Sequence, residues 1–98
     1  MARDEVIHQP TRLQIMATLI TLDPEAQIDF TKLQQLLELT SGNLSTHVQK
    51  LEAAGYVQVT KEFIKRRPKT WLAVTTDGVE AFRKHVAFLE DIMKVSRG

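Results

Sequence analysis

Residues 39–57 read LTSGNLSTHVQKLEAAGYV, and this stretch decides the fold. We expect Ser41 to cap a helix here and Gly55 to stop it. The apolar residues of the stretch recur at spacings of four and three, which places on one helix face Leu44, Val48 and Leu51. The sequence therefore predicts a helix over residues 41–54 that buries an apolar face and leaves the opposite face polar.

Another amphipathic helix precedes this one, separated from it by a tight turn at residues 38–40. We expect it to run to Leu37 from an N-cap at Asp29 or Thr31, after a very short strand within residues 26–30. Upstream of that strand, helical spacing predicts a first helix over Pro10–Leu22, because Pro10 suits a first turn and Pro24 cannot continue a helix. Val6 and Ile7 fit a short turn or helix before it.

The hydrophobic period changes to two after Gly55. β-branched and aromatic residues then predict two strands, over about 56–63 and 71–74, with the basic segment Lys65–Lys69 as the hairpin tip between them. We expect Thr76 or Asp77 to cap a final helix that runs to about Val95. This order predicts a mainly α chain with a small β-hairpin wing (α+β). The architecture is a winged helix-turn-helix, in one domain of residues 1–98.

Composition excludes several classes of protein. A chain of 98 residues has room for one hydrophobic core, and 43% hydrophobic residues with a net charge of +1 are typical of a folded domain. The absence of cysteine excludes disulfides, thiolate metal sites and cysteine nucleophiles. The three histidines are scattered, and no catalytic constellation or phosphate loop appears, so we expect no metal, no cofactor and no enzyme. No segment has the length of a signal peptide or a membrane span, which predicts a cytoplasmic protein without a membrane partner.

Positive charge is concentrated in one part of the chain. Residues 41–71 hold six lysines and arginines against two glutamates, a net charge of +4, whereas the remainder carries −3. Such a basic segment indicates double-stranded DNA as the partner. On the polar face of helix 41–54 and on the wing over 62–70, we expect the DNA-binding residues to be Ser41, Gly42, Asn43, Ser45, Thr46, Gln49, Lys50, Lys65, Arg66, Arg67 and Lys69.

Each of these features also has an interpretation that involves no DNA. A polar helix face is what any solvated helix presents, and a basic loop can serve solubility alone; their combination favours DNA. We expect His47, at the edge of the buried stripe, to be a hydrogen-bonded structural residue rather than a phosphate or base contact. His8 and His85 are expected at the surface, and Arg12 in an internal or cross-dimer ion pair. The residues expected to pack the hairpin onto the helices are Tyr56 and Trp71.

The final helix, about residues 76–95, carries an apolar stripe with alternating spacings of three and four, as a coiled coil does. This stripe can fold back onto its own domain or pair with a second copy, and its length and spacing favour pairing. A two-fold dimer would hold its two reading helices about 34 Å apart, one turn of DNA. We expect a homodimer whose interface is formed by Val79, Phe82, Val86, Leu89 and Met93.

The chain resembles, from about His8 to Ile92, the winged-helix domain of MarR/ArsR-type prokaryotic transcriptional regulators, especially their small single-domain members. The resemblance is carried above all by residues 39–57, and also by PTRLQIM (10–16), FTKL (30–33) and LAVTTDG (72–78). It implies a homodimer on pseudo-palindromic promoter DNA, with the Lys65–Lys69 tip beside the minor groove. It also implies that the major groove receives Ser41, Gly42, Asn43, Ser45, Thr46 and Lys50. Unlike many relatives, the chain has no glycine at the wing tip and lacks the longer flanking helices of larger MarR proteins.

Together these observations predict a sequence-specific transcriptional regulator, a dimeric repressor that reads an inverted repeat in promoter DNA. The alternative is a winged-helix module that docks onto another protein without reading DNA. That alternative accounts for the fold and the apolar stripe but not for the basic tip. A groove between the last helix and the reading helix is a place for a small-molecule effector, although no set of residues specifies one.

Overall fold

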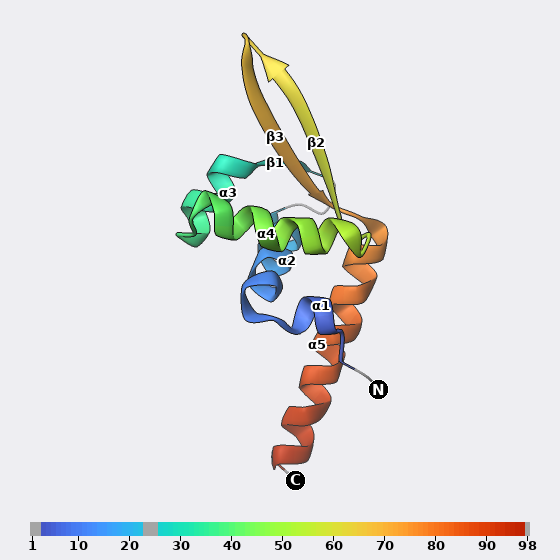
Figure 1. Ribbon diagram of the computed structural model, residues 1–98. Coiled ribbons are helices and arrows are strands. Elements are labelled where there is room, and N and C mark those ends of the chain that lie inside the picture. Colours follow the sequence, from blue (N-terminus) through green and yellow to red (C-terminus); the bar gives the residue numbers. More distant parts are fainter. Residues whose placement is uncertain (1–2, 23–25, 98) are drawn as a thin grey trace.

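Helices surround one end of a three-stranded sheet, and the rest of that sheet stands free (Figure 1). The computed structural model describes residues 3–22 and 26–97. The β hairpin projects from one end of the helical body and the last helix from the other, over principal extents of 58 × 25 × 22 Å. The elements are, in order, α1 (Glu5–His8), α2 (Pro10–Leu22), β1 (Ile28–Asp29), α3 (Phe30–Leu37), α4 (Ser41–Ala53), β2 (Val57–Ile64), β3 (Arg67–Val74) and α5 (Thr76–Arg97). This order confirms the predicted winged helix-turn-helix.

The helix-turn-helix formed by α3 and α4 is fixed by its caps. The Asp29 carboxylate accepts a hydrogen bond of 3.1 Å from the Thr31 N–H, so Asp29 is the cap of the two proposed. Glu38 ends α3 in the left-handed region, with φ 53°. The Thr40 hydroxyl accepts from the Asn43 N–H at 3.1 Å and caps α4. The prediction that Ser41 is this cap is wrong, because Ser41 is already helical and Thr40 is the extended residue before it.

The sheet has the order β1-β3-β2 and is antiparallel throughout. β2 and β3 pair from Val57–Val74 at the root to Ile64–Arg67 at the tip. Lys65 and Arg66 alone form the turn, with φ of 51° and 68°, as a two-residue type I′ turn requires. The predicted five-residue tip Lys65–Lys69 is therefore too long, because its last three residues belong to β3.

One hydrophobic core lies between the helices and the root of the hairpin. The three apolar residues predicted to face inward from α4 are all buried. The core comprises Ile7, Ile15, Met16, Leu19, Ile28, Leu33, Leu44, Val48, Leu51, Val57, Leu72 and Val74. Burying each of these side chains stabilises the fold by about 1.5–3 kcal/mol. In contrast, residues 61–68 of the hairpin are exposed, so this outer part of the wing is free to meet a partner.

The start of α5 is tied closely to the root of β2. The Thr75 hydroxyl accepts a hydrogen bond of 2.9 Å from the Gly78 N–H and caps the helix, so the predicted caps Thr76 and Asp77 lie too far along the chain. A Cβ atom at Gly78 would overlap the carbonyl oxygen of Tyr56. That same oxygen accepts from the Thr75 N–H at 3.0 Å. Only glycine allows this close approach of two backbones.

The inner part of α5 packs on α1 and α2, whereas its outer part extends beyond them (Figure 1). His85 is 1% exposed, so the prediction that it lies at the surface is wrong. The reason is α1, which covers this side of α5 and places the His8 ring edge-on to the His85 ring, with centroids 5.3 Å apart. Within the described ranges, no helix is both long and apolar enough to cross a lipid bilayer.

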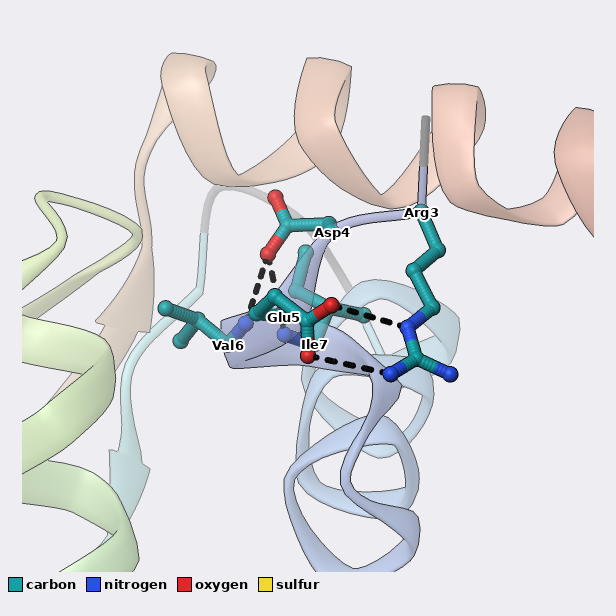
Figure 2. Close-up of polar contacts among 5 residues, drawn as sticks. All are labelled: Arg3, Asp4, Glu5, Val6 and Ile7. Atoms are coloured by element: carbon teal, nitrogen blue, oxygen red, sulfur yellow. Dashed lines mark hydrogen bonds and ion pairs between the residues drawn. The ribbon is translucent and has the colours of Figure 1, made fainter. Parts of the chain in front are cut away.

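α1 is a single helical turn held by Asp4 (Figure 2). One carboxylate oxygen of Asp4 accepts from the N–H groups of Val6 and Ile7 at 2.9 and 3.1 Å. Its other oxygen accepts from the Tyr56 hydroxyl at 2.6 Å. This single carboxylate therefore starts α1 and also binds it to the residue that precedes β2. The predicted packing of Tyr56 between hairpin and helices is confirmed.

Candidate nucleic-acid interface

α4 presents the polar face that the sequence predicts. With its apolar stripe held in the core, the helix cannot rotate, so the direction of the polar face is fixed. Small and amide side chains on such a face can pair with base edges in a major groove. Six of the predicted residues are exposed and Ser45 is half-buried; the exposed ones are Ser41, Gly42, Asn43, Thr46, Gln49 and Lys50.

Within the described part of the chain, no contact requires a glycine at position 42. A Cβ atom built at this position meets nothing within 4 Å, and the residue is exposed in the first turn of α4. A glycine inside a helix is less stable than alanine by about 0.5–1 kcal/mol, so its presence here carries a cost that the fold does not require. Its lack of a side chain leaves the α4 backbone open to close approach by another molecule. The free N–H groups at this helix end also favour a phosphate.

The wing separates the predicted cations into two groups. Lys65, Arg66 and Arg67 are exposed at the free end of the hairpin. Lys69 is half-buried further in, where its ammonium lies 3.7 Å from the Asp29 carboxylate and 5.0 Å from the centre of the Trp71 ring. Lys69 thereby joins the wing to the cap of α3, and its ammonium lies over the ring of Trp71 in the same strand. Its charge is partly matched inside the molecule, unlike the charges at the tip.

A groove of about 570 Å³ separates α4 from the hairpin. Ser41, Ser45 and Gln49 line it from the α4 side, and Lys61 and Thr70 line it from the strands. Lys61 and Thr70 are not among the DNA-binding residues predicted from the sequence. Strand alternation from the apolar Val57 and Val59 would have found Lys61, because every second residue shares a face. The groove thus joins the polar face of α4 to the inner face of the wing.

Arg12 of α2 links His47 of α4 to the backbone of α1. A guanidinium nitrogen of Arg12 lies 3.3 Å from His47 Nδ1, and the Arg12 Nε–H donates to the Val6 carbonyl. His47 makes a hydrogen bond, as predicted, and Arg12 acts inside the domain, but through hydrogen bonds rather than the expected ion pair. Burial, followed by the positive charge of Arg12, lowers the pKa of His47. A neutral His47 fits its place beside a cation.

The predicted interface residues of α5 fall into two environments. Val79 and Phe82 pack against the core of their own domain. Val86 and Leu89 are half-buried, and Met93 is 53% exposed. Ile92 and Val95 are also exposed, so the outer part of α5 carries an apolar strip that the described part of the domain leaves largely uncovered.

Comparison with known proteins places this geometry in a family. Residues 11–93 match the winged helix DNA-binding domain family. An uncharacterized protein of Methanocaldococcus jannaschii is 35% identical over 82 residues, which cover 84% of this chain and 86% of that protein. The solved structure of a transcriptional regulator homologue from Pyrococcus horikoshii is 32% identical and covers 93% of this chain and 87% of its own, with a TM-score of 0.82.

More distant structures share the fold. Streptococcus pneumoniae FabT, solved in complex with DNA, matches with a TM-score of 0.59 and 21% identity over 95% of this chain and 67% of its own. Structures of MarR-family, PadR-family and arsenical-resistance regulators also share it, in agreement with the resemblance seen in the sequence. The family match spans α2 to α5, including the whole of the α4 face and the wing described above. The chain therefore belongs to the winged helix DNA-binding domain family.

Proposed function

We propose that this chain is a sequence-specific transcriptional regulator that binds an inverted repeat in double-stranded promoter DNA as a homodimer and acts as a repressor. α4 would read base edges in the major groove, and the cations of the wing tip would bind the flanking phosphates or minor groove. Repression would follow from occupation of the promoter, in the cytoplasm where that DNA lies.

The observation that carries the proposal is that α4 and the hairpin line the same groove. One groove is bordered by α4, through Ser41, Ser45, Gln49 and Glu52, and by the hairpin, through Val59, Lys61 and Thr70. The cations Lys65, Arg66 and Arg67 are exposed further along the same hairpin. Gly42 leaves the α4 backbone uncovered in the first turn of the helix. The regulator from Pyrococcus horikoshii and the DNA complex of FabT support the same assignment by similarity.

The homodimer rests on the outer part of α5. Leu89, Met93 and the neighbouring Ile92 form an apolar strip that extends away from the domain, and Val79 and Phe82 already serve its core. Pairing two such strips would remove this apolar surface from water and relate the two α4 helices by a two-fold axis. A two-fold protein would require inverted half-sites about one DNA turn apart.

Selection from a random duplex library at near-physiological salt tests the proposal. We expect an enriched inverted repeat whose half-site spacing reports the dimer geometry. A matched library selected with Asn43→Ala should lose preference at one position of each half-site and keep the rest. Retention of DNA without any enriched sequence would contradict sequence-specific reading and indicate an architectural binder.

The competing function is a protein-docking module that never reads DNA, which the apolar strip of α5 would also suit. It predicts that no duplex is retained at all and that binding to a partner protein is insensitive to salt. DNA binding through the wing predicts the reverse, because each phosphate contact releases counterions and makes affinity fall with salt.

A further inference from the structure

The outer hairpin carries an aromatic side chain that the fold does not use. Phe63 is 78% exposed, whereas the other five aromatic side chains of the chain are each at least partly covered. Its neighbour Ile64 is 42% exposed. Isolated apolar residues are ordinary on protein surfaces, but Phe63 is not isolated. Pro68, also exposed, lies directly opposite it on β3.

The register of the hairpin shows which way this pair faces. Alternate residues of a strand share one face, and the face of Phe63 therefore also holds Val57, Val59 and Lys61. Val57 is buried in the core, and Val59 and Lys61 line the groove opposite α4. Phe63 and Pro68 thus lie one step further out on the same face, at the open end of that groove.

The opposite face of the hairpin is mixed at this height, because Ile64 lies there among the charged Glu62, Arg67 and Lys69. Ile64 lies opposite Arg67 there, and the turn that closes the hairpin consists of the cations Lys65 and Arg66. The end of the wing is therefore a thin ribbon with the apolar pair Phe63 and Pro68 on one face, mostly charged side chains on the other, and positive charge at its end. An exposed aromatic side chain carried by a narrow cationic ribbon suits a groove that has negatively charged walls and an apolar stack of bases at its floor.

We propose that Phe63 is an apolar wedge that the wing inserts into the minor groove of duplex DNA, where it partly unstacks a flexible base step beside each half-site. Wedges of this kind bend the duplex and allow it to contact more of the protein. Pyrimidine–purine steps cost least to open, so the wedge adds a preference for such a step at a position where no base edge is read. This inference rests on the proposed function, since it requires that the chain binds duplex DNA.

The test uses the full chain and the duplex recovered by the selection, with 2-aminopurine placed in turn at each position flanking a half-site. We expect wild-type protein to raise the fluorescence at one flanking step, and Phe63→Ala to abolish that rise and weaken binding about ten-fold. The salt dependence of binding should stay unchanged in this variant, because no phosphate contact is lost. Phe63→Leu, which keeps an apolar wedge, should retain part of the fluorescence signal.

Leu36→Ala is the matched control, because Leu36 is an exposed apolar residue on α3 (54% exposed). Neither this change nor Phe63→Ala should alter the unfolding midpoint. If wild type retains duplex but Phe63→Ala binds with the same affinity and fluorescence, the wedge is overturned while DNA binding stands. If wild type retains no duplex, the proposed function fails and the wedge fails with it. A change in the solution mass of Phe63→Ala, with DNA binding intact, would show a contact between copies and overturn the wedge.

Discussion

The Tyr56 hydroxyl donates a hydrogen bond of 2.6 Å to the Asp4 carboxylate, across 52 residues of chain. Asp4 also caps α1, and Tyr56 precedes the first strand of the wing. The hydrogen bond and burial raise the pKa of Tyr56 to about 12. This one contact therefore couples the N-terminal turn to the root of the hairpin.

Tyr56→Phe should lower the free energy of unfolding by about 1–2 kcal/mol at neutral pH, because it removes a hydrogen bond to a charged acceptor. The wild type should lose this contribution as pH rises from about 10 towards 12, since the folded state keeps the proton that the unfolded state releases. Urea unfolding at pH 7, 9 and 11 measures both effects. Equal stability of the two proteins at pH 7 would show that the contact contributes nothing.

The stability of the domain should fall as the solution becomes acidic. Burial lowers the pKa of His85, the nearby His8 acts in the same direction, and Asp4 acts against them. The unfolded state therefore takes up a proton first, so stability is complete above about pH 6.5 and decreases as pH falls through the folded pKa. His85→Leu should flatten this dependence in urea titrations between pH 7.5 and 5.

His47 should make a second, independent contribution to this acid dependence, because burial also lowers its pKa. His47→Gln should remove a separate part of the acid dependence, and the double variant should remove more than either single change. If His85→Leu loses as much stability as the wild type when the pH falls, protonation of His85 does not cause the acid dependence.

Replacement by alanine should have opposite effects on stability at the exposed glycine of α4 and at the buried glycine of α5. Gly78→Ala places a Cβ atom against the Tyr56 carbonyl and should destabilise the domain by about 2–3 kcal/mol. Gly42→Ala meets nothing and should leave stability unchanged or raise it by up to about 1 kcal/mol. If Gly42 admits a DNA backbone, its variant nevertheless binds duplex more weakly. Thermal unfolding and fluorescence anisotropy measure the two properties separately.

Changes at the wing tip and on α4 should weaken DNA binding in different ways. Arg66→Ala and Arg67→Ala should each reduce affinity for all sequences and lower the salt slope by about one. Asn43→Ala should instead cost about 1–3 kcal/mol of discrimination at one base pair and leave the slope unchanged. Anisotropy titrations from low to high salt, on selected and scrambled duplexes, separate these patterns. Similar behaviour of both classes would refute the roles given to them.

Charge on the outer part of α5 should dissociate the proposed dimer. Leu89→Glu with Met93→Glu places carboxylates in the apolar strip and should yield a monomer with much weaker DNA binding. Ala87→Glu, an exposed position on another side of α5, is the matched control and should stay dimeric. Light scattering measures the mass, and a monodisperse dimer in the double variant would contradict pairing through this strip.

The local sequence predicts most of the fold, because α4 and the hairpin are each marked by their hydrophobic periodicity and by the turn residues at their ends. The caps were missed by one or two residues since Thr40 and Ser41, or Thr75 and Thr76, are adjacent hydroxyls that only the backbone conformation distinguishes. His85 was misplaced because its burial depends on where α1 docks. The pairing of Lys69 with Asp29 likewise follows from sheet register across 40 residues, which composition does not reveal.

The turn formed by Lys65 and Arg66 sets two requirements against each other. Both residues adopt a left-handed backbone that costs an ordinary side chain about 1–2 kcal/mol, and asparagine followed by glycine would adopt it with less strain. That replacement would also remove the two charges at the end of the wing. Heat resistance and affinity for DNA therefore pull in opposite directions at these positions. A library of variants sorted only for survival at high temperature would accumulate the replacement and bind DNA more weakly.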